Sequence, residues 1–196
     1  LEVPRKGLIG PWGHKYPHQG LPGPAIGFLQ EALRWWDHWL KGIDSGIMEE
    51  PMLRAWQQDS VPPETAYEER PGRWIGESSW PSRNITERRY ALAPYTICLG
   101  EGHGGSQQHG GQERAQGLQS PLSVGLAAGK WCSYAATPDL PGDQREEDGG
   151  SLIFTSQPLP EALDIFGRPE LEFELSCNKP QAMLAVRLSD VAPDGK

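Results

Sequence analysis

One histidine stands in a setting that suits acid–base chemistry. In the segment LIGPWGHKYPH, the apolar pair Leu8–Ile9 is followed by the rigid turn 10–13 and then by His14. A histidine on a loop beyond a strand end can reach a cleft, take a proton from a nucleophile and return it to a leaving group. Taken alone, the same pattern also fits a surface histidine in a turn.

The usual nucleophile does not accompany His14. The sequence contains no Gly-x-Ser-x-Gly elbow, and the segment GHGGSQQ around Ser106 lacks the closing glycine. The cysteines, Cys98, Cys132 and Cys177, are widely spaced and odd in number. This predicts reduced, mostly packed thiols in a cytoplasmic protein, with Cys132 packed or half-packed.

The remaining histidines and the acidic residues do not predict a metal centre. His103 and His109 lie six residues apart, which is not the spacing of a helical zinc pair, and Asp37–His38 has no third ligand in view. The acidic stretch 143–148 lacks the spacing of a calcium loop, so we expect a solvated run of charge, with calcium binding as the alternative. We expect neither a metal nor a cofactor.

Residues 24–43 predict one long amphipathic helix behind the histidine loop. Pro24 suits its first turn, and Gly42 suits its C-terminal stop. Because Trp36 and Trp39 lie on the apolar stripe, we expect them to pack in a core. The apolar residues at i, i+3, i+4 spacing are Phe28, Leu29, Ala32, Leu33, Trp36, Trp39 and Leu40.

The rest of the chain has the pattern of short strands between turns. The clearest candidate, 171–177, alternates apolar and polar residues, and 182–191 is expected to return as its buried partner. Residues 100–120 and 139–150 are expected to be polar loops. The segments that predict strands are 51–58, 72–81, 87–94, 171–177 and 182–191. We therefore predict an α/β unit in residues 1–46 and an all-β sandwich in residues 51–196, cut at its C-terminus.

The net charge and the distribution of apolar residues exclude some classes of binding partner. The chain has 18 basic and 26 acidic residues, a net charge of −8, which argues against nucleic acid and anionic membranes as partners. No apolar run approaches the length of a membrane span, and the N-terminal segment has no secretory h-region. Partners are therefore expected among small molecules or proteins.

The turn GPWGH and the following helix with RWWDHWLKG resemble the X-Pro dipeptidyl-peptidase and cocaine-esterase-like serine hydrolases, a group that includes the α-amino acid ester hydrolases. The segments GRWIGESSWP and 149–195 resemble the C-terminal domain of the same family. The resemblance implies that residues 1–46 are the last strand, histidine loop and helix of an α/β-hydrolase domain. It implies that residues 51–196 are a jelly-roll similar to galactose-binding modules.

The resemblance also implies a reaction: hydrolysis of a small ester, amide or peptide through an acyl-enzyme, with His14 as general base and then general acid. Trp12 and Tyr16 are candidate substrate-binding residues. The nucleophilic serine and the triad aspartate are expected in an upstream α/β-hydrolase portion of the same protein, so this chain alone is expected to be inactive.

Other functions stay open on the sequence. A non-catalytic β-sandwich could bind a carbohydrate or a protein partner, if Trp74, Trp80 and Trp131 form an exposed platform. The chain could also be one half of an enzyme whose other half is a separate polypeptide. In that case residues 1–42 should be unstable alone, because the tryptophan-rich stripe would lack a cover. Separately, an apolar face exposed by a missing sheet predicts self-association of the chain, so homo-oligomers are also expected.

Overall fold

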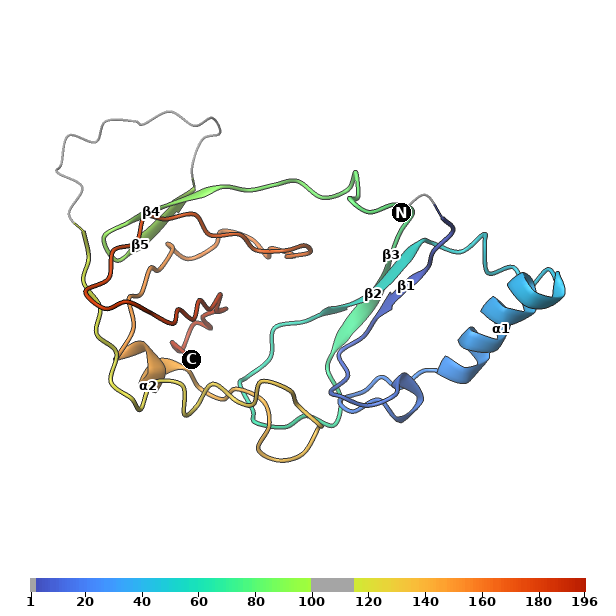
Figure 1. Cartoon of the computed structure of the whole chain (residues 1–196), viewed down its shortest axis with the longest axis horizontal. Coiled ribbons are helices and arrows are strands. Elements are labelled where there is room, and N and C mark those ends of the chain that lie inside the picture. Colours follow the sequence, from blue (N-terminus) through green and yellow to red (C-terminus); the bar gives the residue numbers. More distant parts are fainter. Residues whose placement is uncertain (1–2, 100–114) are drawn as a thin grey trace.

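A computed structural model describes residues 3–99 and 115–196 of the chain. The elements in order are β1 (Gly7–Ile9), the 3-10 turn η1 (Pro17–Gln19), α1 (Phe28–Lys41), β2 (Leu53–Gln58), β3 (Gly72–Glu77), β4 (Tyr90–Ala93), β5 (Thr96–Leu99) and α2 (Arg145–Asp148). Figure 1 shows β1–β3 and α1 at one end of the molecule and the β4–β5 hairpin at the other. Small sheets and few helices make this a β-rich chain.

A three-stranded sheet joins the two predicted regions. β1 runs parallel to β2, and β3 pairs antiparallel on the other side of β2. The central strand β2 carries the buried residues Leu53 and Ala55, and Ile47 adds to this small core. Ala55 faces Ile9 on one side and Ile75 on the other, so the apolar pair before the histidine loop is fixed by the sheet. The predicted strands at 8–9, 51–58 and 72–81 are confirmed within a few residues.

Helix α1 ends where the sequence predicts, and begins later. Gly42 adopts φ 67° and ψ 23°, the left-handed conformation that glycine adopts without strain, and its N–H caps the last turn. Pro24 lies outside the helix, which starts at Phe28.

Helix α1 packs on the chain with the opposite face from the one predicted. Its polar face points to the body of the chain: Arg34 pairs with Glu50 at 2.5 Å, and Glu31 pairs with Arg54 of β2 at 2.7 Å. The prediction that Trp36 and Trp39 pack in a core is wrong, because they are 53 % and 44 % exposed. The ion pairs fix the orientation of the helix. Tyr16 and His18 stack on Phe28 at its start, whereas the rest of the apolar stripe, from Leu29 to Leu40, stays largely exposed.

The segment 139–150 is not simply a polar loop. It contains α2, and Glu147, predicted to be solvated, is 3 % exposed. Its carboxylate accepts hydrogen bonds from the backbone N–H groups of Gly125 and Ala127, which also lower the pKa of Glu147. The acidic side chain is therefore an internal anchor between two loops.

The predicted strand pair at 171–177 and 182–191 is wrong: neither segment forms a strand in the structure. Phe173 and Leu188 remain 49 % and 64 % exposed. Alternation identifies an apolar face, but a strand also needs a neighbour at hydrogen-bonding distance, and pairing depends on distant residues. Instead, β4 and β5, the latter not predicted, form a hairpin, and Ile97 of β5 donates to Thr155.

The finer architecture stays a prediction. This applies to the jelly-roll topology, to the α/β-hydrolase origin of residues 1–46 and to the division between 1–46 and 51–196. Among the residues described, no helix combines the length and the apolar character needed to cross a membrane.

Candidate functional site

The histidine loop is held against a distant segment of the chain. The N–H of His14 donates to the carbonyl of Ser133 at 2.5 Å, and Gly13 N–H donates to Leu21 at 2.9 Å. A Cβ atom at Gly13 would lie 3.0 Å from both Ser133 O and Ala135 N. Glycine at this position therefore permits the backbone approach that fixes the His14 main chain, while the imidazole stays exposed.

A buried aspartate shapes the loop that meets His14. Asp139 is 1 % exposed, and its carboxylate accepts hydrogen bonds from the N–H groups of Tyr134 at 2.8 Å and Ala136 at 3.1 Å. Lys130 Nζ lies 2.5 Å from the other carboxylate oxygen. The hydrogen bond from Lys130, with those two backbone bonds, lowers the pKa of Asp139 to about 2. The loop 130–139 thus folds around one permanently charged side chain at neutral pH.

This loop brings a thiol to the imidazole. Cys132 Sγ lies 3.5 Å from His14 Nδ1, within hydrogen-bond distance for sulfur, and the ring of Tyr134 packs against His14 at a centroid distance of 4.8 Å. Sequence reasoning missed this contact because 118 residues separate the two partners. A thiol beside an imidazole is a nucleophile beside a proton acceptor.

The other thiols differ from the sequence prediction. Cys98 and Cys177 are exposed rather than packed, whereas Cys132 is half-buried, as predicted. All three are free cysteines. The cytoplasmic location inferred from reduced thiols stays a prediction.

The two other predicted site residues lie on the histidine loop but not beside the imidazole contact. Trp12 donates its indole N–H to the carbonyl of Pro24 at 2.8 Å, and its ring fills the space that a Cβ at Gly10 or Gly20 would need. Tyr16 is 66 % exposed and stacks on a neighbouring ring, with the His18 centroid 5.8 Å away. Trp12 therefore holds the loop together, and Tyr16 is the ring that a ligand could reach.

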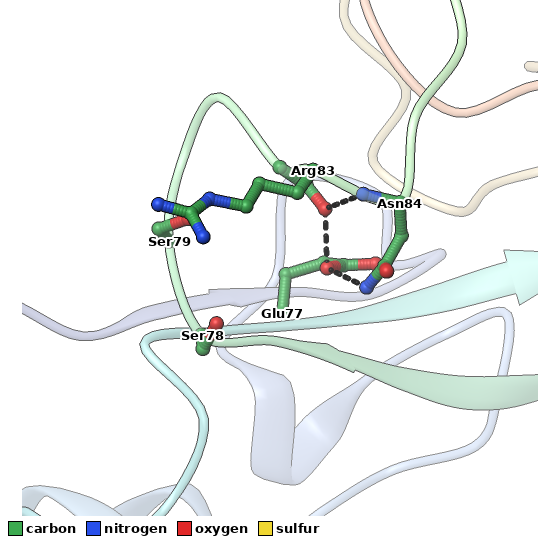
Figure 2. A pocket seen from close by; sticks show the side chains of 6 residues that line it. Glu77, Ser78, Ser79, Arg83 and Asn84 are labelled. Carbon is green, nitrogen blue, oxygen red and sulfur yellow. Dashed lines mark hydrogen bonds between the residues drawn. The ribbon is translucent and has the colours of Figure 1, made fainter.

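A second polar cluster lies at the end of β3. Glu77 and Ser82 are both 9 % exposed, and Glu77 accepts hydrogen bonds from Ser82 Oγ at 2.5 Å and Asn84 Nδ2 at 2.9 Å. Figure 2 labels Glu77 and Asn84 beside Ser78, Ser79 and Arg83. Together with Ser82 these residues line a pocket of about 370 Å³. The cluster has a hydroxyl and a carboxylate but no histidine, and its hydrogen bonds close the turn after β3.

The residues considered for a metal are not gathered. Within residues 3–99 and 115–196, no group of three or more His, Cys, Asp or Glu side chains is placed to hold a metal ion. His38 packs edge-on against Trp39. In the stretch 143–148, Asp143 pairs with Arg145, Asp148 lies 3.5 Å from Arg187, and Glu147 is bonded as described above. His103 and His109 lie outside the described residues.

Residues 45–196, well over half of the chain, match the family model of the X-Pro dipeptidyl-peptidase C-terminal non-catalytic domain. The chain belongs to this family. The family predicted from the sequence is thereby confirmed over residues 45–196, a range that contains GRWIGESSWP but not GPWGH. His14, Trp12 and Tyr16 precede the matched range.

Two curated relatives, from Mycobacterium bovis and Mycobacterium tuberculosis, carry provisional names as serine esterases. Each is 26 % identical to this chain over 202 aligned positions, which cover 96 % of the chain. The chain spans only 28 % of the length of these relatives. No solved structure matches the chain.

Proposed function

We propose that this chain works as the C-terminal part of a serine hydrolase that cleaves a small ester, amide or peptide. In this proposal His14 is the general base and then the general acid of an acyl transfer. A serine nucleophile and an aspartate come from an α/β-hydrolase portion outside this chain. Membership in a family of non-catalytic C-terminal domains and the esterase names of the relatives support the reaction class.

The observation that carries the proposal is the uncovered stripe of α1. Leu29, Leu33, Trp36, Trp39 and Leu40 are between 44 % and 74 % exposed on one helix, while the opposite face is tied down by ion pairs. Exposed apolar surface of this kind marks an interface. An α/β-hydrolase portion that packs on this face would bring its catalytic groups to the same end of the molecule as the histidine loop.

An activity assay tests the proposal directly. The 196-residue chain and a version extended by the α/β-hydrolase portion are treated with a fluorophosphonate probe, a p-nitrophenyl ester and an X-Pro anilide. We expect serine labelling and turnover only in the extended protein. His14→Ala should abolish the turnover, whereas the control His38→Ala should retain it. Turnover in the extended protein that survives His14→Ala would refute the role of His14.

The stripe has its own test in the 196-residue chain. Without a cover, the chain is expected to self-associate, and Leu33→Lys should reduce that association. A sharp monomer peak for the unmodified chain in size-exclusion chromatography would count against the stripe as an interface.

A second candidate function is carbohydrate binding near Trp80. This indole is 41 % exposed and lines a pocket of about 770 Å³ together with polar groups such as Glu49 and Asn84. An aromatic face with polar neighbours is the pattern that a sugar ring requires. Trp80 packs against one ring, that of Phe166 at 5.4 Å, whereas Trp74, 39 % exposed, packs against two, those of Trp12 and Trp56.

Calorimetric titration with a panel of oligosaccharides tests this candidate. Binding that Trp80→Ala removes would support it, with Trp39 of α1, which is 44 % exposed and is mutated to Ala, as the control. Absence of heat across the panel would exclude the platform.

A further inference from the structure

One of the three thiols has a chemical environment that the other two lack. Cys132 Sγ contacts His14 Nδ1 at 3.5 Å, whereas the exposed Cys98 and Cys177 have no imidazole partner among the described residues. The contact joins residues 118 positions apart in the sequence, so it depends on the fold rather than on local chain geometry. The two remaining thiols are built-in controls for any reaction at Cys132.

The partners of the pair are held in place. The main-chain hydrogen bond from His14 to Ser133 fixes the distance between the two loops, and the ring of Tyr134 packs against the imidazole. The Asp139 carboxylate, bonded to the Tyr134 N–H, fixes the segment that carries Cys132. His14 is exposed and Cys132 is half-buried, so a small reagent can approach the sulfur.

We propose that Cys132 and His14 form a nucleophile–base pair that takes an acyl group from an activated ester. The Cys132 thiol gives its proton to His14 Nδ1 as the sulfur attacks the ester carbonyl carbon. A carbon–sulfur bond forms, the carbon–oxygen bond to the leaving group breaks, and the alcohol or phenol departs with the bonding electrons and a proton from His14 or water. The product is a thioester on Cys132, and no oxidant or metal takes part.

This activity belongs to the 196-residue chain and does not rest on the proposed serine hydrolase. It needs only residues that the chain carries and that the structure brings together. If the serine probe fails to label an extended protein, the Cys132–His14 proposal still stands. If Cys132 shows no enhanced acylation, the serine hydrolase proposal still stands.

The test is site-resolved acetylation by p-nitrophenyl acetate. The chain is exposed to the ester at neutral pH, quenched in acid at short times, and the acetyl group on each cysteine-containing peptide is quantified by mass spectrometry. We expect Cys132 to be acetylated at least about tenfold faster than Cys98 and Cys177, since a positioned base contributes typically 10²–10⁴-fold and this pair is partly exposed to water.

Two variants separate the base from the packing. His14→Phe keeps an aromatic ring beside Tyr134 but has no proton acceptor, and His14→Gln keeps a polar side chain without an imidazole. Both are expected to slow Cys132 to the rate of the other two thiols, whose own rates should not change. Equal rates at all three cysteines in the unmodified chain would overturn the proposal. So would a preference for Cys132 that survives both variants.

Discussion

Lys130→Met tests how Asp139 holds together the loop 130–139, which contacts His14. The Lys130 ammonium lies 2.5 Å from the buried carboxylate of Asp139, and its hydrogen bond is the largest cause that lowers the pKa of Asp139 from 3.8 to about 2. Methionine keeps the length of the side chain and removes its charge and donors. A nearby positive charge lowers the pKa of a carboxyl group by about 1–3. Because 60 % of the lysine side chain is exposed to water, we expect its loss to raise the pKa of Asp139 by the lower end of that range, about one.

The sign of the pH dependence follows from the lowered pKa. The ionised carboxylate stabilises the fold fully above the ordinary value of 3.8, and this contribution is lost as the pH falls through about 2. The destabilisation caused by Lys130→Met should therefore be complete at pH 5 and fade as the pH approaches 2. The hydrogen bonds from Tyr134 and Ala136 remain, so the pKa of Asp139 in the variant should stay below 3.8.

Carbon-detected NMR of the Asp139 carboxyl group measures this directly. The titration midpoint is compared between the unmodified chain, Lys130→Met and the control Lys179→Met, which removes the same charge from an exposed site. The control should leave the Asp139 midpoint unchanged. A midpoint near 3.8 in the unmodified chain, or no difference in Lys130→Met, would refute the role given to the lysine.

Three further changes test the parts that position the site, each by chemical denaturation. Gly42→Ala should lower the free energy of unfolding by about 1 kcal/mol because φ is 67° there, whereas Gly117→Ala, in open space without a positive φ, should be nearly neutral. Leu53→Ala should cost about 2–3 kcal/mol because the side chain is 8 % exposed in β2, and Leu122→Ala, fully exposed, less than about 0.5 kcal/mol. Arg54→Met should cost less than about 1 kcal/mol and lose part of this effect in high salt, since its two carboxylate partners are a quarter exposed.

The sequence predicts those features that depend on neighbouring residues. The strand before His14 and the strand at 53–58 follow from the local apolar pattern. The end of α1 follows from the glycine that stands directly after the last apolar turn, Gly42. Family membership could also be predicted, because local motifs such as GRWIGESSWP lie within the matched range 45–196.

Features that depend on distant residues could not be predicted. The Cys132–His14 contact joins two loops 118 residues apart, and neither loop carries a local signal for the other. The orientation of α1 is set by Arg34 and Arg54 with their glutamate partners, and periodicity alone gives two faces without saying which one faces the body. Alternation in 171–177 likewise defines a face but not a partner strand.

His14 is assigned two roles, as the triad histidine for a serine and as the base for Cys132, and both need its ring nitrogen Nδ1. One experiment can therefore test the two roles together. An imidazole has two ring nitrogens, and a hydrolase histidine uses one toward the nucleophile and the other toward the orienting acid. In this chain Nδ1 faces Cys132 Sγ. If an α/β-hydrolase portion supplies a serine and an aspartate, both nitrogens become engaged, and His14 can no longer accept the thiol proton. Acetylation of Cys132 should then slow to the rate of Cys98 in the extended protein while serine labelling appears. Fast acetylation of Cys132 together with full serine turnover would mean that His14 keeps Nδ1 free of an acid, and the triad assigned to it would be wrong.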